Sequence, residues 1–320
     1  MGAAAMMNRI AESLFWIGRY TERAENHARL IDAFYHIREE TSSGERLWIR
    51  IVQALGDPAV FETVYRTYGE REVLHYMILD PNHMNSIQSC VHQARSNLKA
   101  IRDRLPEELW DILNGFALWL KSNETDELLL DSPFLFLKRV KEWLGAFYGA
   151  AHHTMMRDRH WHMMESGRFL ERAENTARLF DSVYHSILED PKKTQFYLFS
   201  AVRAIGGADV FRRLHMDLFS VENVVSLLIL NEKFPRSVQF GLGELEGQLR
   251  SLRNLESSDA AYDKAIRLVV KARAELSWLE GTDGGEASLH DNLVHCMTVI
   301  HGLGGLIGNA FFREEQGAGA

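Results

Sequence analysis

The 320-residue sequence has few cysteines, few prolines and no long apolar run. Its two cysteines, Cys90 and Cys296, are too few for a disulfide framework and lack the spacing of a metal site. A reducing cytoplasm is therefore the expected location. Six prolines in a chain of this length favour long helices over a turn-rich β fold. No stretch reaches the ~20 apolar residues of a transmembrane helix, so no membrane association is expected.

The sequence also lacks the short motifs that bind nucleotides or perform acyl transfer. It contains no P-loop, no glycine-rich dinucleotide fingerprint and no nucleophile elbow, so neither ATP nor another intrinsic cofactor is expected to bind this chain. The net charge of −8, without a strongly basic block, argues against nucleic-acid binding. Glu72 and His75 have the Glu-x-x-His spacing of di-iron bundles, but Val225 replaces the histidine in the aligned second half. No metal is expected.

One polar stretch occurs twice in the chain. The residues from Gly18 to Asn26 return as Gly167 to Asn175, and the similarity continues to His36 and His185. Thirteen of the nineteen aligned positions are identical, where chance would give about one. Further similarities follow at offsets of 150 and 151, between residues 54–61 and 204–211 and between 78–88 and 229–239.

This repetition predicts the architecture. We expect an all-α fold, a single helical domain built from an internal duplication of about 150 residues, with the halves packed as a pseudo-twofold bundle. The first repeat is expected at 9–157 and the second at 158–313. Residues 1–8 are expected to be an N-terminal extension, in which the Gly-Ala-Ala-Ala run is a cloning remnant, and 314–320 a flexible tail.

Hydrophobic periodicity and turn signals predict the helices. Apolar residues spaced three and four apart give one long amphipathic helix over 9–38. Ser86 or Asn85 is expected to cap a helix reaching Arg104, and Pro106 to open the next. A helix that starts at 131–133 is expected to continue through the histidine-rich stretch 152–162 into the second motif. The remaining predicted helices cover 45–55, 58–68, 70–79, 259–280 and 287–312.

The polar side of the motif helix is the candidate functional surface. On a helix, Arg19, Glu22, Arg23 and Asn26 fall within an arc of about 100°. Their counterparts in the second copy are Arg168, Glu171, Arg172 and Asn175, whereas the apolar side differs more between the copies. Three interpretations remain open: a solvated face, an Arg–Glu–Asn network between the motif helices, or an anion-binding cleft. In a cleft, the arginines and asparagines would bind carboxylate or phosphate groups, and Glu22 and Glu171 would act in acid–base catalysis.

Residues 10–30 resemble the opening of the alpha-E family, a bacterial all-helical domain named for its Glu-Arg motif. A second segment, from Ser86 to Asn114, is similar to the internal signature of that family. Within it, Arg95 and Arg102 are further candidate anion contacts, since residues seven apart share one face of a helix. Glu246 stands where the first half has Arg95, so any second site is expected to be degenerate.

The resemblance also implies a cellular role. Members of the family are typically encoded beside, or fused to, a circularly permuted ATP-grasp protein and a transglutaminase-like cysteine peptidase. This implies a subunit of an ATP-dependent amide- or peptide-bond-forming system, in which the partner binds ATP and magnesium. The alternative is a noncatalytic helical scaffold or interaction module whose Arg–Glu motif is a structural network. Whether the chain is itself an enzyme stays open.

Overall fold

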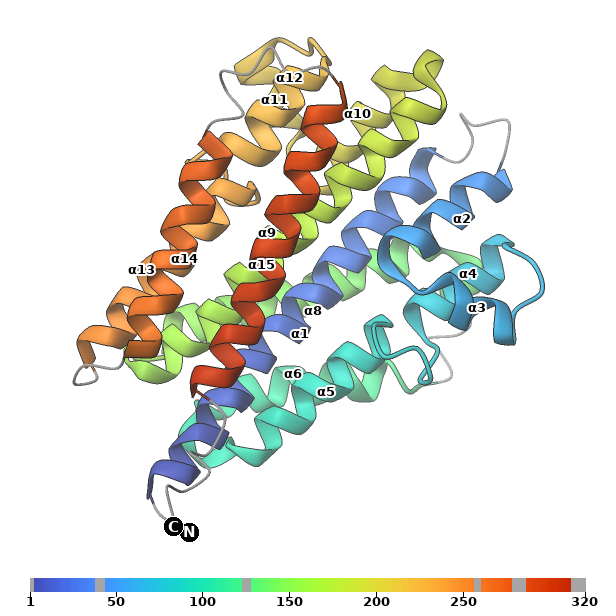
Figure 1. The fold of residues 1–320 in the computed structure, drawn as a ribbon. Helices are drawn as coiled ribbons and strands as arrows, with labels where there is room; N and C mark the ends of the chain where they lie inside the picture. The colour runs from blue at the N-terminus through green and yellow to red at the C-terminus, as the bar shows by residue number, and fades with distance from the viewer. Residues whose placement is uncertain (1–2, 38–43, 123–127, 256–259, 278–285, 312–320) are drawn as a thin grey trace.

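Helices account for nearly all regular structure in the computed structural model, which describes residues 3–37, 44–122, 128–255, 260–277 and 286–311 (Figure 1). No strand occurs within these ranges, and the predicted all-α fold is confirmed. None of the helices within them combines the length and apolar character needed to cross a bilayer. The predicted tail at 314–320 lies outside the described residues.

The helices up to residue 154 form a first set. Two long helices, α1 and α8, enclose shorter ones and the 3₁₀ turn η2. Their bounds are α1 Ala3–Ile37, α2 Gly44–Leu55, α3 Pro58–Val64, α4 Glu70–Ile78, α5 Ile87–Ala100, η2 Arg102–Arg104, α6 Glu107–Trp119 and α8 Pro133–Thr154.

The helices after residue 158 follow the same order. A long helix is followed by three short ones, then by three longer ones, and the π-helical turn η4 extends α12. Their bounds are α9 Arg159–Glu189, η3 Pro191–Lys193, α10 Thr194–Ala204, α11 Ala208–His215, α12 Val221–Val225, η4 Ser226–Leu230, α13 Val238–Leu255, α14 Ala260–Ser277 and α15 Glu286–Phe311.

The helices α1 and α9 lie side by side at the centre of the molecule and run in the same direction (Figure 1). They approach most closely at Gly18 and Gly167. A Cβ atom on Gly18 would overlap the carbonyl oxygen of Met164, and one on Gly167 would overlap that of Phe15. The two backbones therefore touch, and a side chain at either position would push the helices apart.

The surrounding helices contact this central pair in matching ways. In the first set α5 and α8 pack on α1, and in the second set α13 and α15 pack on α9. Likewise α6 contacts both α5 and α8, and α14 contacts both α13 and α15. Because helices pack around the motif segment, Thr21, Glu22 and Glu25 are buried together with the predicted apolar stripe, while Arg19 and Arg23 stay partly exposed.

Several predicted helix ends were wrong for local reasons. The helix predicted over 58–68 ends at Val64, because Tyr65 is extended and its side chain bonds elsewhere. The helix expected to run from 133 into the second motif is interrupted after Thr154. Met155 is extended there, and the Asp158 carboxylate accepts bonds from the first backbone N–H groups of α9. This interruption falls at the expected boundary between the repeats.

Two other predictions changed in detail. The first helix begins at Ala3, inside the segment expected to precede the first repeat. The helix capped by Ser86 ends at Ala100, so Arg102 lies in η2 and does not share a helix face with Arg95. Ser86 does cap that helix, because its hydroxyl accepts the backbone N–H of Ser89 at 3.1 Å.

Candidate functional site

The Glu-Arg pair of each motif helix binds the pair of the other. The guanidinium of Arg172 donates to both carboxylate oxygens of Glu22, at 2.8 and 2.6 Å. Arg23 does the same to Glu171, at 2.6 and 3.0 Å. Both contacts are bidentate, the strongest geometry available to an arginine and a carboxylate. Each glutamate thus lies at the contact between α1 and α9, and the solvated-face interpretation is wrong.

The first arginine of each copy behaves differently in the two halves. Arg19 crosses to α9 and donates to Glu171 at 2.6 Å and to Glu174 at 2.7 Å. Its equivalent Arg168 pairs with Glu165 of its own helix at 3.3 Å and lies over the ring of Tyr148. The buried Nε of Arg168 makes no hydrogen bond with the described residues. The network is therefore reciprocal at its centre and asymmetric at this edge.

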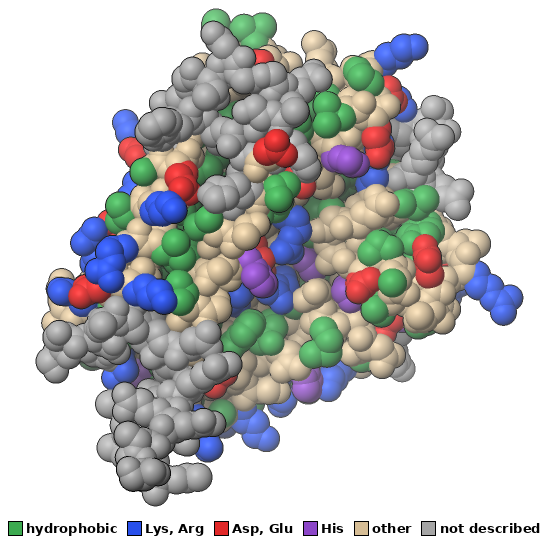
Figure 2. Space-filling model, in the orientation of Figure 1, with side chains coloured by type: hydrophobic (Ala, Val, Ile, Leu, Met, Phe, Trp, Pro, Cys, Tyr) green, Lys and Arg blue, Asp and Glu red, His purple; other side chains and the backbone are tan. Residues whose placement is uncertain are grey.

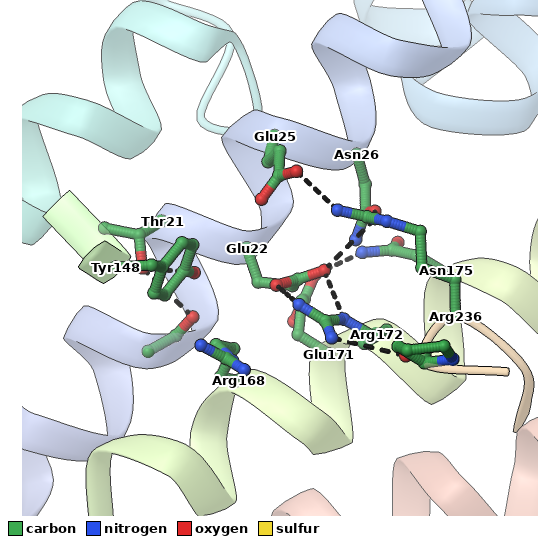
Figure 3. A network of polar contacts seen from close by, with 12 residues as sticks. Thr21, Glu22, Glu25, Asn26, Tyr148, Arg168, Glu171, Arg172, Asn175 and Arg236 are labelled. Atoms are coloured by element: carbon green, nitrogen blue, oxygen red, sulfur yellow. Dashed lines mark hydrogen bonds and ion pairs between the residues drawn. The ribbon is translucent and has the colours of Figure 1, made fainter. Parts of the chain in front are cut away.

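Two residues outside the motif complete the network. Arg236, in the loop before α13, donates to Asn26 at 2.9 Å and pairs with Glu25 (Figure 3). Asn85, in the loop before α5, accepts a hydrogen bond from Arg23 at 2.9 Å. Sequence reasoning did not single out either residue for this role. The 151-residue offset aligns them with each other, and this was the available signal.

The central carboxylates are held in the ionised state. Burial alone would raise the pKa of Glu22, but Arg172 and then Arg236 lower it to about 2. For Glu171 the opposing effects are burial and the charges of Arg23 and Arg19, and the pKa is again lowered. Both side chains are buried, and both oxygens of each carboxylate accept hydrogen bonds from arginine. This geometry favours a counter-ion role for Glu22 and Glu171 over the acid–base role expected from the sequence.

A second pair of titratable groups lies beside Glu22. Burial raises the pKa of Glu165, only partly offset by Arg168 and Arg172. Burial and the neighbouring Glu22 charge raise the pKa of Tyr148 well above its usual range. The Tyr148 hydroxyl lies 2.9 Å from that of Thr21 (Figure 3). Burial thus acts against the ionised form of Glu165, whereas the arginines around Glu22 favour its ionised form.

The ion-pair network around the motif contains more arginines than glutamates. Seven arginines, one of them Arg236 from the loop before α13, and five glutamates form this network, which leaves an excess of two positive charges within it even with every carboxylate ionised. An unbalanced charge in a largely buried cluster is costly and attracts an anion. The arginines are Arg19, Arg23, Arg29, Arg168, Arg172, Arg178 and Arg236, and the glutamates are Glu22, Glu25, Glu165, Glu171 and Glu174.

Part of this excess charge reaches the surface. Arg19 and Arg23 keep 11% and 18% of their side chains exposed, whereas Glu171 beneath them keeps 1%. The helix α15 passes over Arg19, and its Gly304 leaves room for the guanidinium. On the face drawn in Figure 2, arginine or lysine and histidine side chains gather in a hollow beside α15. The arginines thus present donors outward while the glutamates lie below.

Arg95 and Arg102 lie apart from this network. Arg95 donates to Asn114 at 2.8 Å, and its guanidinium lies over the ring of Trp110. Arg102, which is half exposed, lies over the same ring and pairs with Glu107 at 3.7 Å. The two arginines therefore converge on Trp110 from different elements. At the position equivalent to Arg95, Glu246 pairs with Arg250 and Arg273.

The described residues contain no group of three or more histidine, cysteine or carboxylate side chains placed to hold a metal. His75 instead contacts the Tyr65 hydroxyl at 2.8 Å. Cys90 is completely buried, as predicted, while the side chain of Cys296 lies outside the described residues. His27 is also buried, and burial followed by the charge of Arg23 lowers its pKa to about 3.

Comparison with known proteins places this geometry in a family. Residues 6–312 match the model of Alpha-E, described as a predicted alpha-helical domain with a conserved ER motif. Uncharacterized proteins of Mycobacterium bovis and Mycobacterium tuberculosis are 26% identical over 264 residues, which is 76% of this chain and 30% of each relative. The chain thus spans about a third of their length. No solved structure is significantly similar. Since the family model covers nearly the whole chain, the protein belongs to the Alpha-E family.

Proposed function

We propose that this chain is the anion-binding helical component of an ATP-grasp-dependent system that forms amide or peptide bonds. The observation that carries the proposal is the excess of arginine over glutamate in the ion-pair network around the motif, with Arg19 and Arg23 partly exposed. A guanidinium fork matches the geometry of a carboxylate or a phosphate. Such a surface suits a substrate carboxylate or the acyl phosphate formed when that carboxylate is activated.

In this proposal the arginines and glutamates have separate roles. Glu22 and Glu171 hold the arginine side chains in fixed rotamers, because each accepts a bidentate contact from the opposite helix. The Nη1 group of Arg19 forms no hydrogen bond with the described residues and is free to bind an anion. Activation by ATP and magnesium takes place on a circularly permuted ATP-grasp partner in the cytoplasm. A transglutaminase-like peptidase is a second partner.

We also infer that the two halves arose by duplication of about 150 residues. The reciprocal contacts of Glu22 with Arg172 and of Glu171 with Arg23 support it, since a twofold relation requires each contact to occur twice. Arg19 binds glutamates of the opposite helix, whereas Arg168 pairs with a glutamate of its own helix. This difference supports one anion site, at Arg19, and not two. The extra length of the mycobacterial relatives is consistent with this domain working beside others.

Anion binding by the intact chain is the first test. Acetyl phosphate and inorganic phosphate should each raise the melting temperature of the wild-type protein, and Arg19→Lys should reduce that rise. The lysine keeps the charge but lacks the fork, which limits damage to the fold. Arg250→Lys, at an exposed position on α13, is the matched control and should respond as wild type. An identical response of Arg19→Lys and wild type would count against the proposal.

Coexpression with an ATP-grasp protein tests the wider role. The proposal expects a stable complex whose ATP-dependent amide formation falls strongly in Arg19→Ala and less in Arg168→Ala, because Arg168 pairs within its own helix. A competing function, as a noncatalytic scaffold, is favoured by the contacts of Glu22 and Glu171, since each binds an arginine of the opposite helix. A scaffold predicts that the same variants lose thermal stability while the folded fraction still binds the partner with unchanged turnover.

A further inference from the structure

A separate cavity of about 520 Å³ opens between α3, α4 and the segment 128–131. One side is apolar and is formed by Leu74, Leu79, Leu129 and Leu130. Leu130 remains 56% exposed at its edge, while Leu74 and Leu129 are buried. The volume lies within the range of small-molecule sites, and such sites combine apolar walls with a few placed polar groups.

A fixed hydrogen-bond chain forms the polar side. The Tyr65 hydroxyl donates to the buried carboxylate of Asp80 at 3.0 Å and lies 2.8 Å from Nδ1 of His75. Since the hydroxyl proton is directed to Asp80, its oxygen accepts the proton of Nδ1. A neutral His75 must then carry its free lone pair on Nε2. Asp80 is itself held by the backbone N–H of Asn82 at 2.9 Å, so the chain is rigid.

Two opposite charges lie at the cavity without partners. Neither Arg71 nor Glu72 forms an ion pair or side-chain hydrogen bond with another described residue, although both line the cavity. Adjacent cationic and anionic groups that do not pair with each other can bind both ends of a zwitterion. Arg71 matches a carboxylate, and Glu72 matches an ammonium group.

The second half lacks this arrangement. Phe61 stacks on Tyr65 and Tyr68, and Phe211 contacts His215 and Phe219 in the same way, so His215 occupies the place of Tyr65. Val225 stands in place of His75 at the offset of 150, and Asn231 in place of Asp80 at the offset of 151. The helices of the two halves are arranged alike, but the second half has none of the three residues Tyr65, His75 and Asp80. The helix packing therefore does not require this hydrogen-bond chain.

We propose that this cavity binds an α-amino acid with an aliphatic side chain. Arg71 would bind the carboxylate, Glu72 and Nε2 of His75 the ammonium group, and the leucines the side chain. The site is distinct from the arginine network of the motif helices and does not depend on its function. Either site can therefore fail its test without affecting the other.

Calorimetric titration of the full chain with L-leucine tests the proposal. Isocaproate, which lacks the ammonium group, and isoamylamine, which lacks the carboxylate, should each bind at least tenfold more weakly. Arg71→Gln should weaken leucine binding about tenfold and leave isoamylamine binding unchanged, and Glu72→Gln should affect isoamylamine but not isocaproate. Arg66→Gln, at an exposed position outside the cavity, is the control. Absence of leucine binding, or equal binding by wild type and Arg71→Gln, would overturn the proposal.

A second measurement examines the hydrogen-bond chain directly. In ¹⁵N spectra of histidine-labelled protein, His75 should be protonated on Nδ1, and Tyr65→Phe should shift it toward the usual Nε2-protonated form. His75→Asn assigns the signal and should weaken leucine binding. If His75 is protonated on Nε2 in the wild type, the proposed ammonium contact is wrong.

Discussion

At the scale of single residues, the central feature is a pair of enclosed carboxylates that are each bound by an arginine from the opposite helix. Removing Glu22 and Arg172 from water costs several kcal/mol per ion, and their bidentate contact offsets that cost only while both partners are present. Such pairs contribute to the selection of one helix arrangement more than to net stability. An arrangement that separates the partners leaves a buried charge unpaired.

The Glu22→Gln variant should therefore lose about 3–5 kcal/mol of unfolding free energy, because Arg172 would remain buried without a counter-ion. Urea denaturation measures this loss. Arg178→Ala, which removes a pair whose arginine is 43% exposed, is the control and should change stability by less than about 1 kcal/mol. Equal losses of stability in the two variants would contradict the burial of the Glu22–Arg172 pair.

Stability should also depend on pH through His27. Its pKa is about 3 in the folded chain and 6.5 as a reference value, so below pH 6.5 the unfolded state binds a proton that the folded state does not. Unfolding free energy should fall as pH decreases from 6.5 toward 3, by up to about 1.4 kcal/mol per pH unit. Glu22 adds a loss between pH 4.5 and about 2, since its folded pKa is also lowered.

In urea denaturation measured between pH 6.5 and 4.5, the unfolding free energy of His27→Leu should depend less steeply on pH than that of the wild type. His153→Leu replaces an exposed histidine and should leave the slope as in wild type. An unchanged slope in His27→Leu would show that this histidine is not responsible.

At the scale of elements, the closest contact is between the backbones of α1 and α9. The glycines at positions 18 and 167 permit it, and each faces a carbonyl group of the other helix. This short separation allows the charged groups of Glu22 and Arg172 to meet in a bidentate contact. Glycine at these positions is therefore required by packing, although it lowers helix propensity.

The Gly18→Ala variant should lose well over 1 kcal/mol of stability, because the added methyl group meets backbone atoms that cannot move aside independently. Gly149→Ala on α8 is the matched control. No atom lies within 4 Å of its added Cβ, so the gain in helix propensity of up to about 1 kcal/mol should stabilise the chain. Thermal unfolding of both variants tests the contrast, and stabilisation by Gly18→Ala would contradict the close approach.

At the scale of the whole molecule, the two sets of helices form one core. Because α1 and α9 each bury much of their surface against the other, neither set encloses its own hydrophobic residues. Fragments 1–157 and 158–320 should therefore lack cooperative unfolding when expressed alone and regain it when coexpressed. Circular dichroism during heating, with size-exclusion chromatography of the mixture, measures this. Independent cooperative unfolding of either fragment would show that the halves are separate domains.

Much of the fold could be predicted because helices depend on local signals. The 3.6-residue periodicity of Leu14, Ile17, Ala24 and Ile31 predicted α1, and all four residues are buried. Helix ends were less predictable, since they depend on individual side chains. The break between α8 and α9 results from the N-cap formed by Asp158. The sequence around it has a continuous helical pattern, so the break was not predicted.

The sequence by itself determined the all-helical class, the two copies of the motif and the chemical character of the residues that they repeat. Periodicity and identity are properties of the chain, so they need no knowledge of contacts. Only the tertiary structure decided that the polar face is enclosed, that Glu22 binds Arg172 while Glu171 binds Arg23, and that Arg236 and Asn85 join them. Those contacts join residues about 60 to 210 positions apart, and they depend on the separation and direction of α1 and α9, which local sequence does not encode.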